Sequence, residues 1–113
     1  MTDLEKIALC AKAMGWATKT AGPNGELYCL VQKNPKDEWQ HFDPLNYDEH
    51  AMALVKQLSL GIDRKGYMEG QWIAYGYGDI FGQEDILNRA IVECVVKMQK
   101  HSTAAPDEPK ETK

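Results

Sequence analysis

Residues 86–98 read ILNRAIVECVVKM, and this stretch decides the fold of the chain. Its apolar side chains recur at the i, i+3, i+4 spacing of one helix face. They are Ile86, Leu87, Ala90, Ile91, Cys94, Val95 and Met98. The spacing predicts an amphipathic helix that follows Gly82 and ends near Lys100. Such a helix buries its apolar stripe, so we expect it to cover one face of a sheet.

Two further helices are predicted upstream. The first starts at Thr2, which forms a capping box with Glu5, and ends at Gly15. The second is capped by Asn46 and ends at Gly61. Their apolar stripes are Leu4, Ile7, Ala8, Ala11 and Met14 in the first, and Ala51, Leu54, Val55 and Leu58 in the second.

Two strand pairs separate these helices. The turn Gly22-Pro23-Asn24-Gly25 predicts a hairpin of residues 16–20 and 26–32. The second pair is weakly patterned over residues 62–69 and clearer over 71–77. The strands 26–32 and 71–77 carry apolar side chains on both faces, so we expect both faces to be covered. We interpret residues 33–43 as a loop or a short irregular edge strand.

The predicted fold class is therefore α+β, in the order αββαββα. An antiparallel four-stranded sheet would have helices packed on both faces, as an α/β/α sandwich. Residues 1–101 would form one domain. Residues 102–113 hold no strongly hydrophobic side chain, so we expect a disordered C-terminal tail.

Composition excludes several classes of function. The 113 residues carry a net charge of −4 with bases and acids interleaved, which argues against a duplex-DNA partner. No long apolar run predicts a membrane partner, and no signal peptide is recognisable at the first residues. Cys10, Cys29 and Cys94 are interpreted as reduced core thiols. We therefore expect a cytoplasmic protein, in a bacterial host cytosol, without a cofactor.

Short motifs point to a family. Met14-Gly15-Trp16 ends the first helix, Asp43-Pro44 precedes the second, and Asn88-Arg89-Ala90 lies in the third. Over about residues 4–100 this layout resembles the small phage proteins of the ABA sandwich domain family. The run Tyr75-Gly76-Tyr77-Gly78 departs from that pattern. The resemblance implies a phage or prophage origin and helices on both faces of an antiparallel sheet, and it carries over no catalytic residue.

Three chemical constellations are weak. In residues 76–82 the third glycine comes one position late for a dinucleotide-binding GxGxxG, and no P-loop lysine follows. His41 and His50 flank the second helix near acidic residues, but no metal-binding His spacing exists. Cys29 and His41 would suit a nucleophile and its base only if the thiol left the core. We therefore predict no metal site and no catalytic residue.

Aromatic side chains carry the remaining functional hypotheses. They group around Trp39 and around Tyr75, and the pattern leaves core packing and surface recognition open. The favoured function is a small phage accessory protein that binds a host protein, with inhibition of a host process or defence as one form. The alternative is a small-molecule or nucleotide-derivative binder with an aromatic pocket, and the third is a small hydrolase. Homo-oligomerisation stays open. Candidate binding residues are Trp39, His41, Tyr75, Tyr77 and Asp79.

Overall fold

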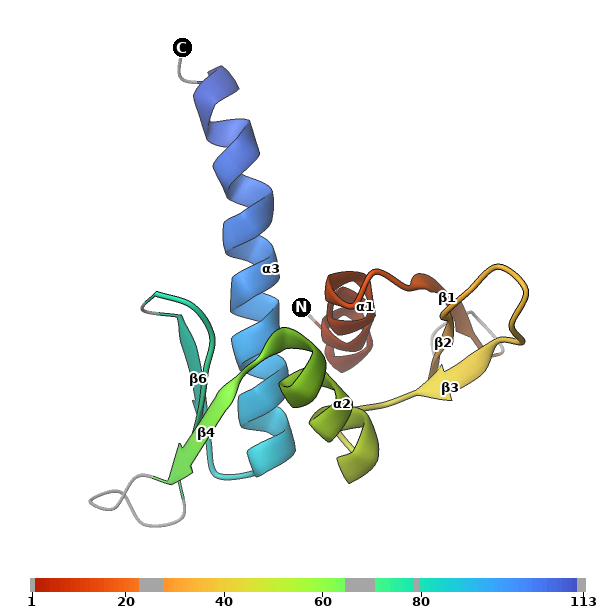
Figure 1. Cartoon of the computed structure of the whole chain (residues 1–113), viewed down its shortest axis with the longest axis horizontal. Helices are drawn as coiled ribbons and strands as arrows, with labels where there is room; N and C mark the ends of the chain where they lie inside the picture. Colours follow the sequence, from red (N-terminus) through yellow and green to blue (C-terminus); the bar gives the residue numbers. More distant parts are fainter. Residues whose placement is uncertain (1, 23–27, 65–70, 79, 112–113) are drawn as a thin grey trace.

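The computed structural model describes residues 2–22, 28–64, 71–78 and 80–111, with side chains described as far as His101. Within these residues a helix and three strands are followed by a second helix, three more strands and a final helix (Figure 1). The elements are α1 (Asp3–Ala13), β1 (Ala17–Ala21), β2 (Tyr28–Gln32), β3 (Gln40–Phe42), α2 (Asp48–Leu58), β4 (Gly61–Arg64), β5 (Trp72–Tyr75), β6 (Phe81–Glu84) and α3 (Leu87–Glu111).

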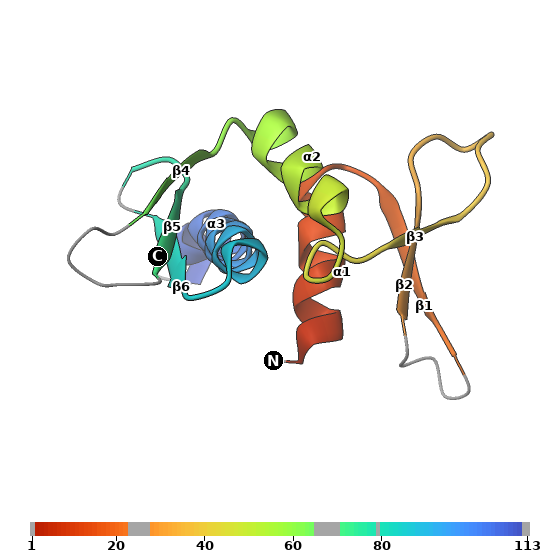
Figure 2. The same ribbon diagram turned by 90° about the horizontal axis from the view of Figure 1, so that it is seen from below.

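The strands form two separate three-stranded antiparallel sheets, β1-β2-β3 (sheet A) and β4-β5-β6 (sheet B). Figure 2 shows α1 and α3 between them, with sheet A beside α1 and sheet B beside α3. The α+β class is confirmed, but the predicted four-stranded sheet with helices on both faces is wrong. The layering is inverted, since the helices lie inside and the sheets outside.

The error has a physical origin in the short strands. β3 has three residues, and β4 and β6 have four each, which is too short for a clear period-two pattern. In β6 the residue facing α3 is Gly82, which gives no hydrophobic signal. The second faces of β2 and β5, predicted to be covered, are covered only in part. Tyr28 is 40% exposed and Tyr75 is 42% exposed, whereas Ile73, on the same face as Tyr75, is buried at 5%.

The buried stripe of α3 is confirmed and is wider than predicted. Ala90, Ile91, Cys94 and Val95 are fully buried, and Val92 and Val96 are buried beside them. α3 is enclosed because sheet B lies on one side of it and α1 and α2 pack on another. Ile86 precedes the helix and is 54% exposed, so it does not belong to the stripe.

Sheet B approaches α3 to backbone contact. A Cβ atom added at Gly82 would lie 2.3 Å from the carbonyl oxygen of Ala90 and 2.6 Å from the amide nitrogen of Cys94. One added at Gly76 would lie 2.6 Å from the Met98 sulfur. Gly76 and Gly82 of the Gly-rich segment therefore serve close packing on a helix, whereas Gly78 has a φ of +61° and open space around it.

The predicted helix ends are confirmed in α1 and wrong in α2. Thr2 and Glu5 form the reciprocal capping box, and Gly15 follows α1 with a φ of +81°. In α2 the N-cap is Tyr47, without a side-chain cap bond, so Asn46 does not cap the helix. Ser59, with a φ of 55°, ends α2 in place of Gly61.

The Asn88-Arg89-Ala90 motif ties α3 to its neighbours. The buried Asn88 amide donates to the Asp48 carboxylate at the start of α2 (3.0 Å). Arg89 forms an ion pair with Asp3 of α1 (3.0 Å). The carbonyl oxygen of Ala90 lies at the close contact with Gly82 of β6. Each residue of the motif therefore contacts a different element.

Three sequence predictions fall at the limits of the described structure. Most of the Gly22-Pro23-Asn24-Gly25 turn lies outside the described residues, although β1 and β2 pair antiparallel as expected. The helix α3 includes residues 102–111, which were expected to be disordered. No side chains are described there, so both the tail and the domain bounds stay predictions.

Candidate functional site

A cavity of about 880 Å³ lies between the first turns of α1 and sheet A, beside the start of α3. We call it the groove. Its walls come from α1, from the facing ends of β1, β2 and β3, and from the turn that enters α2. The described residues that line it include Asp3, Glu5, Ile7, Tyr28, Cys29, His41, Phe42, Asp43, Leu45, Asn46, Ile86 and Arg89.

Three exposed rings gather at one side of the groove. We call Tyr28, His41 and Tyr47 the His41 cluster. The His41 ring lies 5.7 Å from Tyr28 and 5.7 Å from Tyr47, centroid to centroid, and both pairs meet edge to face. Tyr28 and Tyr47 are 40% and 45% exposed. The cluster thus offers polar-tipped aromatic surface beside a concave site.

His50 positions the turn beneath this cluster. Its ring stacks on Phe42 at 5.6 Å, and its Nδ1 accepts the Asp43 backbone N–H at 2.9 Å. Burial lowers the pKa of the His50 imidazole, against the opposing effect of Glu49. A neutral ring keeps the lone pair that this bond needs. The Asp43 carboxylate in turn accepts from the Leu45 amide (3.2 Å) and from the Asn46 side chain (2.7 Å).

The two other carboxylates of the groove, those of Asp3 and Glu5, also accept hydrogen bonds. The Arg89 guanidinium lowers the pKa of Asp3 by hydrogen bonding. The backbone N–H of Thr2 donates to Glu5 at 2.7 Å and lowers the pKa of that carboxyl. Both groups are therefore fixed as anions near neutral pH.

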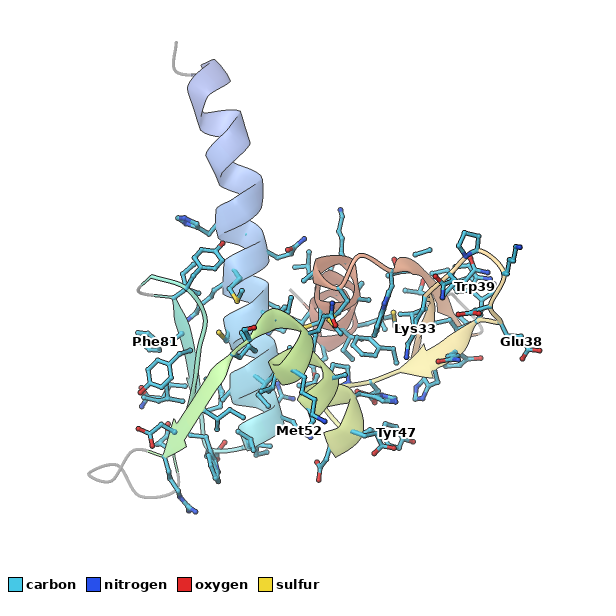
Figure 3. The ribbon with its side chains drawn as sticks, in the orientation of Figure 1. Lys33, Glu38, Trp39, Tyr47, Met52 and Phe81 are labelled. Carbon is cyan, nitrogen blue, oxygen red and sulfur yellow. The ribbon has the colours of Figure 1, made fainter. Side chains whose placement is uncertain are left out.

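The structure does not bring the predicted site residues together. His41 lines the groove. Trp39 is half-buried on sheet A, with the Lys19 ammonium 4.4 Å from its ring. Tyr75 and Tyr77 belong to the sheet B region and do not line the groove. Figure 3 shows Trp39 and Phe81, the partner of Tyr75 across the sheet, on opposite sides of the molecule. Asp79 lies outside the described residues.

The thiol chemistry considered from the sequence finds no support in the geometry. Cys29 pairs with Phe42 on the buried face of sheet A, whereas His41 pairs with Leu30 on the other face. Burial raises the pKa of the Cys94 thiol to about 11 and also raises that of Cys29. Across the residues that the structure covers, no three His, Cys, Asp or Glu side chains are placed to hold a metal ion.

Sequence reasoning missed most of the groove. The sequence places Tyr28 on a covered face, Glu5 in a helix cap and Asp43 in a loop or edge strand, whereas in the structure all three line the groove. Arg89 lies in α3, which the sequence identifies only by its apolar stripe. Its partner Asp3 is far away along the chain, so their pairing has no local signal. Only the aromatic grouping around residues 39–47 signalled this region of the molecule.

Comparisons with known proteins add no assignment. No protein-family model matches the chain, and no curated protein matches it. Among the described residues, none of the helices combines the length and apolar character needed to cross a membrane.

Proposed function

We propose that this is a non-catalytic binding protein, a small phage or prophage accessory protein that engages a host protein in the bacterial cytosol. The groove and the adjacent His41 cluster form the binding surface. The observation that carries the proposal is the placement of half-exposed Tyr28 and Tyr47 around His41 beside a cavity of about 880 Å³. Aromatic anchors beside a pocket are typical of the residues that dominate protein interfaces.

The chemistry of the groove supports binding over catalysis. Its thiol, Cys29, is buried and its pKa is raised. The carboxyls of Asp3 and Glu5 have lowered pKa values, so they are poor proton donors near neutral pH. The phage origin, and the inhibition of a host process or defence, are supported by the resemblance of the Asp43-Pro44 and Asn88-Arg89-Ala90 motifs to the phage ABA sandwich domain family.

Paired double variants test the proposal. The variant Tyr28→Ala/Tyr47→Ala removes two exposed rings beside the groove, and Tyr75→Ala/Phe81→Ala removes two equally exposed rings on sheet B. Tagged protein would be incubated with bacterial host lysate, and captured proteins quantified by mass spectrometry. We expect the first variant to lose at least about tenfold of the captured partner and the second to retain it. Loss only in the sheet B variant would place the interface there, and no specific capture by the unaltered protein would overturn the proposal.

A second function has one observation in its favour. A volume of about 880 Å³ falls within the range of small-molecule sites, so the groove can also hold a free ligand. The aromatic pocket would then lie at Tyr28 and His41 and not at Tyr75 and Tyr77. Native mass spectrometry of freshly purified protein separates the two functions, because a co-purified small molecule adds a defined mass that a protein partner does not.

A further inference from the structure

We propose that the groove selects a positively charged side chain, arginine in preference to lysine, and so docks a basic segment of the partner protein. This inference rests on the proposed function, since it names the chemistry of the partner at that same surface.

Charge is the first argument. Among the described residues that line the groove, the carboxylates of Asp3, Glu5 and Asp43 face one guanidinium, that of Arg89, which leaves a formal charge of −2. Arg89 is already paired with Asp3 through both of its terminal nitrogens, at 3.0 Å and 3.5 Å. The carboxylates of Glu5 and Asp43 form no ion pair with a lysine or arginine among the described residues, and the charge of the N-terminal ammonium acts on Glu5 as a smaller effect.

These two carboxylates are fixed in place and still have capacity. Glu5 accepts one backbone N–H, and Asp43 accepts one backbone and one side-chain N–H. A carboxylate has about four lone-pair sites, so each can accept further bonds from a ligand. Their neutral hydrogen-bond donors orient them without cancelling their charge.

The rings of the His41 cluster provide the second argument. Tyr28 and His41 both line the groove, and they meet edge to face at an interplanar angle of 83°. A guanidinium is planar, stacks on aromatic faces and bonds carboxylates with two parallel N–H groups. An ammonium lacks the plane and the fork, which is why we expect arginine to be preferred.

An anionic ligand fits the groove poorly, although the N-terminus of α1 lies there. The backbone N–H of Glu5 is already bonded to the Thr2 hydroxyl at 3.1 Å. The first turn of α1 also carries Asp3 and Glu5, whose charges offset the favourable end of the helix dipole. A phosphate would face these carboxylates and Asp43, so a nucleotide is disfavoured.

Capped model peptides give a direct test on the whole protein. Acetyl-Gly-Gly-X-Gly-Gly-amide would be titrated with X as arginine, lysine, norleucine or glutamate, and amide NMR shifts followed at Ala8, Thr20 and His41, which line the groove. We expect the arginine peptide to bind at least about fivefold more tightly than the norleucine peptide, with lysine between them and no saturable shift with glutamate. Equal binding of the norleucine or glutamate peptide, or shifts spread away from the groove, would overturn the inference.

A matched pair of variants separates the groove from the general acidity of the protein. Glu5→Gln retains the capping box, which accepts Gln as well as Glu, but removes one groove charge. Glu38→Gln removes one charge from an exposed position outside the groove. We expect arginine-peptide affinity to fall about threefold or more in the first and less than about 1.5-fold in the second. Equal losses in both would refute a groove-specific site.

The two proposals fail in different ways. If the host protein is still captured through Tyr28 and Tyr47 while the arginine peptide does not bind, the charge assignment is wrong and the binding surface stands. If the arginine peptide binds at the groove but no partner depends on those rings, the proposed function fails and the cation site remains.

Discussion

The two sheets are built alike and packed differently. Sheet B meets α3 through Gly82, where an added Cβ atom would lie 2.3 Å from the Ala90 carbonyl oxygen, so no ligand can enter between them. Sheet A leaves a cavity of about 880 Å³ along the first turns of α1. The contact between sheet B and α3 leaves no room for a ligand, whereas the space between sheet A and α1 is large enough to hold one.

The exposed aromatic residues of the two sheets differ in the same way. On sheet B, the Tyr77 hydroxyl donates to the Met98 carbonyl (3.3 Å), and the Lys97 ammonium lies 5.3 Å from the Phe81 ring centroid. These side chains are engaged with α3. In the His41 cluster the rings contact one another and border the groove. Exposure alone does not mark a recognition surface, but exposure beside a cavity is typical of one.

The largest effect is expected where sheet B is tightest. Gly82→Val should lower the free energy of unfolding by more than about 3 kcal/mol, because the contacts it creates are with backbone atoms that cannot move aside. Denaturant unfolding followed by circular dichroism measures this change. The control is Gly61→Ala in the same sheet, whose new Cβ would meet Tyr75 at an ordinary 3.5 Å. Similar stability for both variants would contradict the close packing of sheet B on α3.

A smaller difference in the free energy of unfolding is expected between equivalent Val→Ala substitutions in sheet A and in α3. Val31 in sheet A and Val95 in α3 are both buried, at 2% and 0% exposure. We expect Val95→Ala to lower stability by about 2–3 kcal/mol and Val31→Ala by about 1–2 kcal/mol, because sheet A borders the groove through Cys29 and Phe42 and can relax into that space. Chemical denaturation of both variants gives the comparison. A larger loss at Val31 would mean that sheet A is as tightly packed as the helical core.

The positions of the helices could be predicted from the sequence, whereas the order of the helix and sheet layers could not. Both outcomes have a physical reason. The stripe of Ala90, Ile91, Cys94 and Val95 and the Thr2–Glu5 capping box are local patterns that the structure confirms. The layer order depends on which sheet covers which helix. Contacts such as that of Gly82 with Ala90 determine which sheet covers which helix. Gly82 allows this contact because it has no side chain, and a glycine gives no hydrophobic signal in the sequence.

The groove could not be predicted from the sequence, for a related reason. Its residues come from α1, sheet A and the start of α3, and each has a local structural role that explains its presence in the sequence. Asp3 and Arg89 are brought together only by the packing of α1 on α3. The aromatic grouping around Trp39 left core and surface open, and the structure exposes His41 but buries Phe42. A binding role for His41 stays a prediction. The matching interpretation for Tyr75 and Tyr77 stays a prediction.

Removal of the ion pair at the rim of the groove should have a modest effect on stability. The Asp3 and Arg89 side chains are 55% and 38% exposed, so solvent screens their attraction. We expect Arg89→Gln to lower the free energy of unfolding by less than about 1 kcal/mol and to make the groove more acidic. The arginine peptide should then bind more tightly, by about two- to threefold in low salt. Unchanged or weaker binding in the NMR titration would argue against an electrostatic contribution of the groove.

The smallest expected effect is the pH dependence contributed by His50. Burial holds its pKa below the usual 6.5, so in the window just below 6.5 the unfolded chain binds more protons than the folded one. Stability from this group is fully present above pH 6.5 and is lost as the pH falls through that window towards the folded pKa. Protonation also places a proton on the Nδ1 that accepts the Asp43 N–H, so the turn beneath the His41 cluster should loosen first.

The variant His50→Asn isolates that contribution, because its amide oxygen can replace the Nδ1 acceptor without titrating. Denaturant unfolding of both proteins at several pH values between about 5 and 8 gives the difference in slope. We expect the unaltered protein to lose more stability than the variant on acidification, and amide exchange to increase around Asp43 and Leu45 before it increases in β5. Equal slopes would mean that His50 titrates alike in the folded and unfolded chains, and early exchange in β5 would place the weaker packing at sheet B.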